Sequence, residues 1–462
     1  MGYFSQCSKI LEKNGIKYSD LRINRFCSET IVVEDENVSS IKENENTSYG
    51  IRVFYNGAWG FVYGNDLKRI SHSCERAIKL AKLGSRQIKT KFEIKDLKKV
   101  NDIVQPMKQT NPIEVDISDK IKKLMNLNAS LKRKNVKNRT STAAFSVSEE
   151  EFYNSVGSEI LQTKYHMGLR STIVGKEGNE IGRAVERVGK MSGYEQFEVI
   201  DENEVADRIY ESLLRALKAE HAPAGKFPII VDNELCEVFF HEAVGHACEA
   251  DAVLEGTSVL GDKLGRKIAP QYLTLVDTPL INLENGYYKY DDEGAKSQET
   301  VLINDGILNK FMQSLETASR MKTEPTGNGR AESPASTPYP RMSNTVLLPG
   351  DYSFDELIEG IKSGIYAKGS SGGVVEPNNG NFLFNAQEAF LIKNGKVTVP
   401  LKDVSLCGNI LDILPKIEKI GKDDKPTFYG GRCGKKGQLV PVGGKAPHIK
   451  ISEAMIGGQN TK

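Results

Sequence analysis

The sequence lacks the features that would place it in several large classes of protein. No stretch approaches the roughly 18 consecutive apolar residues of a membrane-spanning helix. The first residues, MGYFSQCSKILEKNG, lack the apolar segment of a secretory signal. Neither sign of charge is in excess, because the chain has 62 Lys and Arg against 61 Asp and Glu. We therefore expect a cytoplasmic protein with no membrane anchor and no broad nucleic-acid surface.

Cysteines are also few and scattered. Seven occur, at positions 7, 27, 74, 236, 248, 407 and 433, and no two of them form a Cys-x-x-Cys pair. An odd, dispersed set in a long chain is typical of free thiols in a reducing compartment. The sequence therefore argues against a fold held together by disulfides.

Length and composition are those of a globular protein with more than one domain. The chain has 462 residues, of which 39% are hydrophobic and 27% charged, and one core rarely extends over so long a chain. The segment HAPAGKFP, residues 221–228, is the best candidate for a domain boundary. We predict an α+β fold, with an N-terminal α/β domain over residues 1–222 and a β-rich C-terminal domain over residues 223–462.

Turn and cap residues divide the first half into helices and strands. Asn56-Gly57 lies between two apolar runs in YGIRVFYNGAWGFVYGN, which indicates a hairpin because a type I′ turn needs positive φ at both central residues. Strand-like sequence further on has turns expected at Gly157, Gly175 and Gly178. Helices are expected at residues 4–15, 67–84, 116–133 and 203–222.

The second half begins with a predicted strand, 227–232, and a helix over about 234–253 that Asp232 or Asn233 can cap. This helix carries the segment FFHEAVGHACEAD (239–251), with two of the six histidines of the chain. An ordinary buried helix face, with both histidines satisfied by hydrogen bonds, is one interpretation. Two imidazoles and a carboxylate are costly to bury in so apolar a segment without partners, which favours a metal site.

The two histidines are one residue further apart than in the common zinc-peptidase helix. His241 and His246 are separated by five positions, and Glu242 directly follows the first. At about 100° per residue, a regular α-helix would hold the two rings roughly 140° apart around its axis, so they could not share one ion. A π-type turn absorbs one extra residue, and Gly245 lowers the cost of irregular backbone. We predict such a turn within 241–246.

A catalytic zinc site usually has three protein ligands, so a third is needed. Glu249 follows His246 by three residues and could reach the same face, while Asp251 and Glu255 are further candidates nearby. Cys433 lies in YGGRCGKKGQ, where flanking glycines allow the backbone to approach a crowded centre. Spacing alone does not decide between Glu249 and Cys433.

Several blocks of the sequence resemble the TldD/PmbA family of metallopeptidases. HEAVGHACEAD is similar to the His-Glu-x-x-x-His signature of that family, and YGIRVFYNGAWGFVYG looks like its N-terminal hairpin. Further similar blocks follow in the family's order: TGNGRAES (326–333), PRMSNTVLLPGD (340–351), FLFNAQEAFLIKNGKVTVPLKDVSLCGN (382–409) and CGKKGQLVPVG (433–443). Because the motif is intact, the chain resembles the catalytic TldD type rather than the zinc-free partner type.

The resemblance implies a particular metal centre. Its ligands would be His241, His246 and Cys433, with one Zn²⁺ per catalytic chain. Glu242 would be the catalytic residue, a general base that activates the attacking water. Glu249, together with Asp251, would then be a candidate to accept hydrogen bonds from the ligands.

The resemblance also implies an activity and an assembly. The C-terminal domain would be a metallopeptidase that hydrolyses unstructured peptides or unfolded proteins within an enclosed cavity. The chain would form a homodimer, or a heterodimer with a zinc-free family partner. Two alternatives are a non-catalytic peptide-binding or regulatory subunit of a TldD/TldE-like complex, and a zinc hydrolase of non-peptide substrates.

Two further segments of the sequence are candidates for contacts with a substrate. The apolar strand NFLFNAQEAFLI (381–392) could pair with a peptide backbone, or it could be a plain core hairpin. Arg330, in GNGR, could bind a peptide carboxylate or an oxyanion, or it could form a structural salt bridge.

Overall fold

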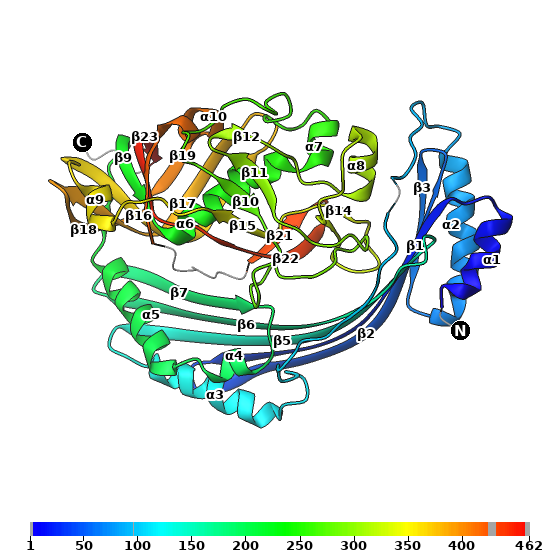
Figure 1. Ribbon diagram of the computed structural model, residues 1–462. Helices are drawn as coiled ribbons and strands as arrows, with labels where there is room; N and C mark the ends of the chain where they lie inside the picture. The colour runs from blue at the N-terminus through cyan, green and yellow to red at the C-terminus, as the bar shows by residue number, and fades with distance from the viewer. Residues whose placement is uncertain (1–2, 96, 424–430, 458–462) are drawn as a thin grey trace.

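The computed structural model describes residues 3–95, 97–423 and 431–457. Figure 1 shows a long curved sheet built from the first half of the chain, beneath a β-rich body built from the second half. Helices and mainly antiparallel sheets are mixed in both halves, so the predicted α+β fold is confirmed. No helix of the described chain is long and apolar enough to cross a membrane.

The first sheet has seven described strands in the order β3-β2-β1-β5-β6-β4, with β7 paired to β6. The strands are β1 Tyr18–Glu34, β2 Asn37–Tyr55, β3 Ala58–Gly64, β4 Asn101–Val104, β5 Val136–Asn154, β6 Glu159–Glu177 and β7 Glu180–Lys190. Several of them are unusually long. Because successive side chains point to opposite faces, each of these strands contributes to both a convex and a concave face.

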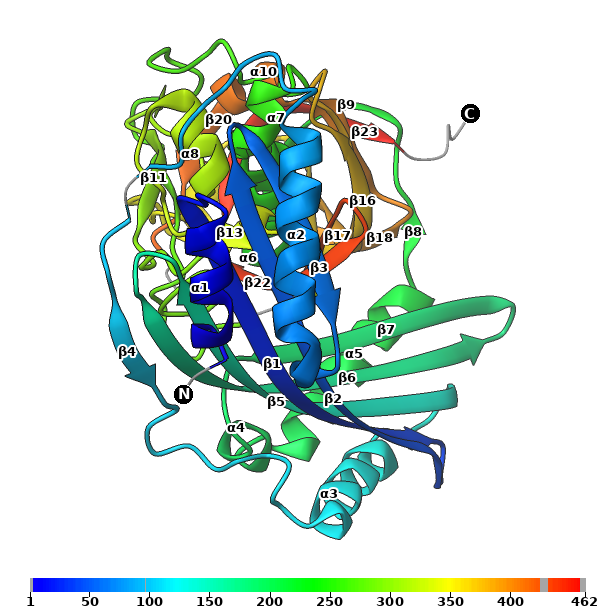
Figure 2. The ribbon, with the colours of Figure 1, turned by 90° about the vertical axis from the view of Figure 1, so that its right-hand side faces the viewer.

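The described helices of the first half cover the convex face. They are α1 Ser5–Lys13, α2 Ile70–Gly84, α3 Ile117–Ser130, α4 Glu195–Glu198 and α5 Glu202–Leu217, with the short turn η1 Leu67–Arg69. Leu21 and Ile51 pack under α1 and α2, and Leu169 and Ile173 pack under α3 and α5. Figure 2 shows α1 and α2 side by side on the outer side of the sheet. The concave face is left for the second half of the chain.

The turn predictions for the first half are mostly confirmed. Asn56 and Gly57 have φ of 46° and 90° and join β2 to β3. Gly157 and Gly178 also have positive φ, in the β5–β6 and β6–β7 turns. The turn expected at Gly175 is wrong, because this residue lies inside β6. A side chain at that position would come within 2.6 Å of the methyl groups of a leucine of α5, so close packing explains the glycine.

The second half contains two larger sheets. The eight-stranded sheet runs β16-β9-β23-β19-β17-β18-β8, with β20 on β23, and it closes on itself because β16 also pairs with β17. Its strands are β8 Glu220–His221, β9 Gly225–Val231, β16 Ser363–Glu376, β17 Asn381–Lys393, β18 Lys396–Lys402, β19 Ser405–Asn409, β20 Ile417–Ile420 and β23 Ile449–Gly457.

The six-stranded sheet runs β12-β11-β10-β15-β22-β21. Its strands are β10 Leu275–Asp277, β11 Thr300–Asn304, β12 Ile307–Leu308, β15 Asn344–Leu347, β21 Gly431–Lys435 and β22 Gln438–Lys445, and β13 Gly329–Arg330 pairs separately with β14 Tyr339–Pro340. Short helices complete this half: α8 Leu315–Met321, α9 Phe354–Ile358, α10 Ile410–Ile413 and η4 Leu414–Lys416.

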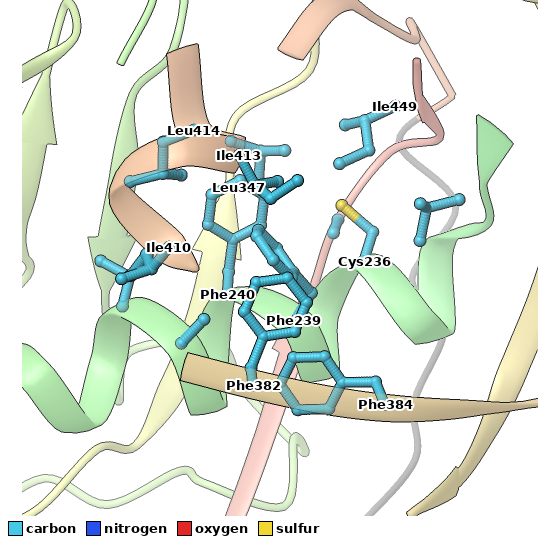
Figure 3. Packing of buried hydrophobic residues seen from close by; sticks show 14 of the residues in the cluster. Cys236, Phe239, Phe240, Leu347, Phe382, Phe384, Ile410, Ile413, Leu414 and Ile449 are labelled. Carbon is cyan, nitrogen blue, oxygen red and sulfur yellow. The ribbon is translucent and has the colours of Figure 1, made fainter. Parts of the chain in front are cut away.

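Helix α6, Asn233–Phe240, contacts strands of both of these sheets and forms the centre of the core. Figure 3 shows Phe239 of this helix packed against Phe382 and Phe384 of β17, and the ring of Phe240 contacts that of Phe239. The Phe239 ring lies edge-on to the Phe382 ring at 5.4 Å between centroids. Such aromatic packing holds the helix rigidly, and the helix leads directly into the histidine motif.

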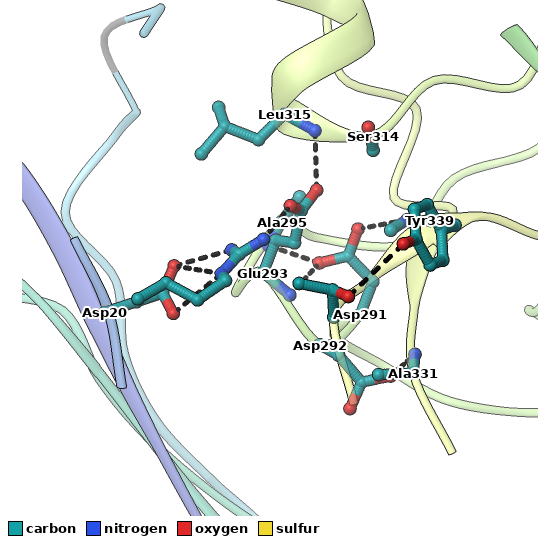
Figure 4. A network of polar contacts seen from close by, with 12 residues as sticks. Asp20, Asp291, Asp292, Glu293, Ala295, Ser314, Leu315, Ala331 and Tyr339 are labelled. Atoms are coloured by element: carbon teal, nitrogen blue, oxygen red, sulfur yellow. Dashed lines mark hydrogen bonds and ion pairs between the residues drawn. The ribbon is translucent and has the colours of Figure 1, made fainter. Parts of the chain in front are cut away.

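A buried ionic network connects the first sheet to the second half. Arg52 of β2 contacts Asp20 of β1 through two nitrogens, and its Nη1 lies 2.8 Å from Glu293 Oε1. Glu293 also accepts a hydrogen bond from the backbone of Leu315 at the start of α8. Figure 4 shows this chain of contacts running from the sheet into the loop around Asp291. The network fixes the concave face of the sheet against the second half.

Candidate metal centre

The predicted break in the histidine helix is confirmed. After α6, residues His241–Gly245 form a π-helical turn (η2), followed by a short tight turn, His246–Cys248 (η3), and by α7, Ala250–Leu254. The rings of His241 and His246 lie 5.4 Å apart between centroids. The extra residue of the motif is absorbed by the π turn, so both rings point into one site.

Close packing explains the glycine in this turn. A Cβ at Gly245 would lie 2.0 Å from Sδ of the buried Met342. Asp232 caps the start of α6 by accepting hydrogen bonds from the backbone of Leu235 and Gly369, both at 2.9 Å. The helix start and the turn are therefore both fixed by contacts with other parts of the chain.

Cys433 reaches the two histidines from the six-stranded sheet. It lies on β21, which pairs with β22, and its side chain is 4% exposed. Its Sγ is 3.4 Å from His246 Nε2, and one donor atom of each of the three residues lies within 4.8 Å of the others. The structure thus brings together His241, His246 and Cys433, and it does not place Glu249 among these donors.

The spacing and chemistry of the three donors fit a tetrahedral zinc ion. Zinc bonds of about 2.0–2.3 Å place neighbouring donors roughly 3.4–3.6 Å apart, close to the observed separation of Cys433 and His246. The second nitrogen of each ring faces a different group. His246 Nδ1 lies 3.0 Å from Glu249 Oε2, and His241 Nδ1 lies 3.5 Å from Thr345 Oγ1. In each histidine, Nε2 is therefore the ring nitrogen that can bind a metal. Contacts of this kind to the other ring nitrogen usually orient metal-binding histidines.

The protonation state of the thiol also suits a metal. Burial alone would raise the pKa of the Cys433 thiol, but hydrogen bonds and charge interactions with His241 and His246 lower it to about 5. The thiolate is the form that binds metals. At neutral pH the site therefore presents a sulfur anion beside His241 and His246.

A lysine completes the surroundings of the centre, and the sequence analysis missed it. Lys435 Nζ donates to Glu249 Oε2 at 3.0 Å, to Asp251 Oδ1 at 2.6 Å and to the backbone oxygen of Pro340 at 3.1 Å. Burial would raise the pKa of Glu249, but the charges of His246 and Lys435 lower it to about 2. A signal was available, because the lysine follows the cysteine by two positions and so shares its strand face.

Glu242 lies at the open side of the centre. Its Oε2 is 3.6 Å from His246 Nε2, and its side chain is 36% exposed. Together with His246, Val375 and Pro377 it lines a cavity of about 520 Å³. A carboxylate thus stands next to the metal ligands where a substrate could enter.

Arg330 is not part of this centre. Its side chain is buried, donates to the backbone oxygen of Met342 and stacks over the ring of Tyr288 at 4.9 Å. It lines a different cavity, of about 490 Å³, which shares no lining residue with the cavity at Glu242. These contacts are structural, and a role in substrate binding stays a prediction.

The suggestion that the strand 381–392 pairs with a peptide is wrong. This segment is β17, and both of its edges are occupied, by β16 on one side and by β18 and β19 on the other. It is a central strand, so its backbone has no free edge for a peptide.

A mixed α+β fold that carries two histidines on a π turn, a glutamate beside them and a distant thiolate defines a metal-dependent hydrolase. Three family descriptions match the chain: PmbA/TldA metallopeptidase domain 1 at residues 19–81, the central domain at 110–217 and the C-terminal domain at 224–458. The chain belongs to the PmbA/TldD family of metallopeptidases.

Individual relatives agree with this assignment. A metalloprotease of Methanocaldococcus jannaschii is 40% identical over 92% of this chain and 94% of its own length. A zinc metalloprotease TldD homolog of Saccharolobus solfataricus is 31% identical over 97% of this chain and 98% of its own. The fold is similar to that of TldE from Thermococcus kodakarensis, with a TM-score of 0.78 at 20% identity, over 99% of this chain and 100% of that one.

Proposed function

We propose that this metallopeptidase binds one Zn²⁺ per chain through His241, His246 and Cys433, and that it hydrolyses unstructured peptides or unfolded proteins. The observation that carries the proposal is the convergence of these three donors within 4.8 Å, although the third lies almost two hundred residues from the others. The Saccharolobus solfataricus relative is named a zinc metalloprotease, which supports the choice of metal.

When bound, zinc supplies a Lewis acid that polarises the scissile carbonyl and makes water more acidic. Glu242 then acts as the general base, because its carboxylate stands at the solvent-accessible side of the site, 3.6 Å from a ligand nitrogen. It takes a proton from the attacking water and gives it to the leaving amine. Glu249 and Lys435 hold His246 in place throughout.

The strand edge next to the site suggests how a peptide would bind. Strand β16 pairs with β17 over most of its length, but with β9 only over residues 365–367, and Asp232 accepts a hydrogen bond from the backbone of Gly369, so within the described chain its second edge has no strand partner from residue 370 onward. Residues 371–374 are exposed, and Val375 lines the cavity that contains Glu242. An extended peptide could add to this edge through backbone hydrogen bonds, which would require an unfolded substrate.

Two substitutions test the proposal together. Glu242→Gln should lower kcat on a disordered fluorogenic peptide by about 10²–10⁴-fold, as expected for loss of a general base, while the protein keeps its zinc. Cys433→Ser should lower the zinc content of the purified protein. Metal analysis and peptide cleavage are measured on the same samples, with a small ester substrate in parallel. Undiminished zinc in Cys433→Ser, or full peptide cleavage by Glu242→Gln, would contradict the assignment.

The alternative is a non-catalytic peptide-binding or regulatory subunit. An intact donor set with Glu242 beside it favours the enzyme. We further propose a cytoplasmic homodimer, or a heterodimer with a zinc-free partner of the same family. Sedimentation of the purified chain alone distinguishes the homodimer from the heterodimer.

A further inference from the structure

Three arginines lie on one face of β6 and β7 without any acidic partner. Arg170 and Arg187 are direct cross-strand partners, and Arg183 follows on the same face of β7. None of the three makes an ion pair or hydrogen bond with any described residue, and partial burial, together with repulsion from the other two, lowers the pKa of Arg170. We call these three residues the arginine face. Like charges directly opposite each other destabilise a strand pair, so an anion bound here would relieve repulsion.

The arginine face lies on the concave side of the first sheet. Leu169 and Ala184 point to the convex side, where they pack with α5, so the alternation of the strands turns the three arginines the other way. Figure 1 shows this side of β6 and β7 facing the β-rich second half. By contrast, Arg208 of α5, on the convex side, is paired with Glu186 at 2.9 Å. The unpaired positive charge therefore faces the space between the two halves.

This face connects to the metal centre along β16. Arg183 and Ser371 line one cavity of about 460 Å³ between the two halves. Val375, four residues further along β16, lines the cavity with Glu242 and His246. At about 3.3 Å per residue, these two points of the strand are roughly 13 Å apart. The interval between them includes the free, exposed edge of β16.

From this arrangement we infer that the arginine face binds acidic side chains of the peptide substrate. At the rise per residue of an extended chain, these side chains would lie about four to six residues from the cleaved bond. The inference rests on the proposed peptidase function and adds a substrate preference to it. A peptide paired to β16 at the metal centre would continue into the cavity at Arg183. Carboxylates at that distance would meet guanidinium groups, with which they form favourable paired hydrogen bonds.

The test uses two peptides with the same cleavable core. One carries a tail of three glutamates and the other a tail of three glutamines, four to six residues from the core. For the zinc-loaded wild-type chain, KM should be roughly fivefold lower with the glutamate tail, since exposed ion pairs contribute modestly. The preference should vanish at about 1 M salt, where charges are screened within about 3 Å. The double variant Arg183→Gln, Arg187→Gln should lose it, while the matched control Arg208→Gln should keep it.

The possible outcomes separate this inference from the proposed function. Equal KM for both tails in the wild type, or a preference that survives in the double variant, would overturn the inference and leave the peptidase proposal intact. If no peptide is cleaved, the peptidase proposal fails, and fluorescence anisotropy of the labelled glutamate peptide then decides whether the face binds it. A single-stranded oligonucleotide that binds more tightly than this peptide, through the same arginines, would assign the face to nucleic acid instead.

Discussion

Lys435 shows how much a single side chain can contribute to a metal centre that it does not enter. It neutralises Glu249 and Asp251, and Glu249 in turn contacts the Nδ1 of His246. One buried oxygen of Glu249 already lacks a hydrogen-bond partner in the described structure. Without the lysine, the carboxylate would lose one of its two cationic partners and its fixed position, because a buried charge is tolerated only when it is paired.

Lys435→Met should therefore weaken zinc binding by about 10–100-fold, the range typical of altered second-sphere contacts. The zinc dissociation constant, measured by competition with a chelating dye, checks this. Lys436→Met is the matched control, because Lys436 contacts Asp251 and Glu255 but not Glu249. Lys435→Arg, which keeps the charge, should recover part of the affinity. If both methionine variants bind zinc equally well, Lys435 does not position the site.

At the scale of elements, the π turn could be predicted from local sequence. The spacing of Lys435 from Cys433 placed the two on one strand face, but the contact of Lys435 with Glu249 could not be predicted. The five-residue spacing of His241 and His246 leaves a regular helix unable to bring both rings to one ion, so local geometry requires an irregular turn. Cys433 needed the family resemblance, because no local rule connects a strand residue to helical turns almost two hundred residues away. The contact of Lys435 with Glu249 depends on the same distant packing. Local sequence determines the turn, whereas tertiary structure determines its partners.

The π turn itself can be tested at its glycine. Gly245→Ala would place a methyl carbon 2.0 Å from Sδ of Met342, which is fully buried. Forcing extra atoms into a packed core typically costs about 1–3 kcal/mol, and here the displaced backbone carries His246. We expect a lower thermal midpoint and weaker zinc binding. Gly434→Ala, next to Cys433, is the control, because its nearest contact would be an ordinary 3.5 Å. Equal behaviour of the two variants would show that the turn tolerates a side chain.

At the scale of the whole molecule, the order of strands determines which strand edge lacks a partner. The apolar sequence of β17 suggested a peptide-binding strand, yet β17 is central, and the free edge belongs to β16. The sequence of a strand reports how buried its faces are, but not which strands lie beside it. The division of the chain into domains at residues 222 and 223 stays a prediction, although the first sheet is built only from strands that end before it.

The two halves are joined by charges that are almost fully buried. Arg52 is 3% exposed and contacts Asp20 and Glu293, which are 0% and 1% exposed. Removing one partner of a buried ion pair leaves an uncompensated charge and costs about 3–5 kcal/mol. Arg52→Met leaves two buried carboxylates side by side, so we expect a clear fall in the thermal midpoint. Arg69→Met, at an exposed position of η1, should have little effect.

A triple variant distinguishes loss of charge balance from loss of packing. When Asp20→Asn and Glu293→Gln are added to Arg52→Met, no charge is left unpaired, and replacing a whole buried ionic group by neutral residues is often nearly neutral for stability. The triple variant should therefore be more stable than Arg52→Met alone. If it is less stable, the network acts through shape and hydrogen bonds rather than through charge. If Arg52→Met has the same thermal midpoint as the wild type, the ionic contact does not hold the concave face against the second half. Other contacts must then maintain the space that leads to the metal centre.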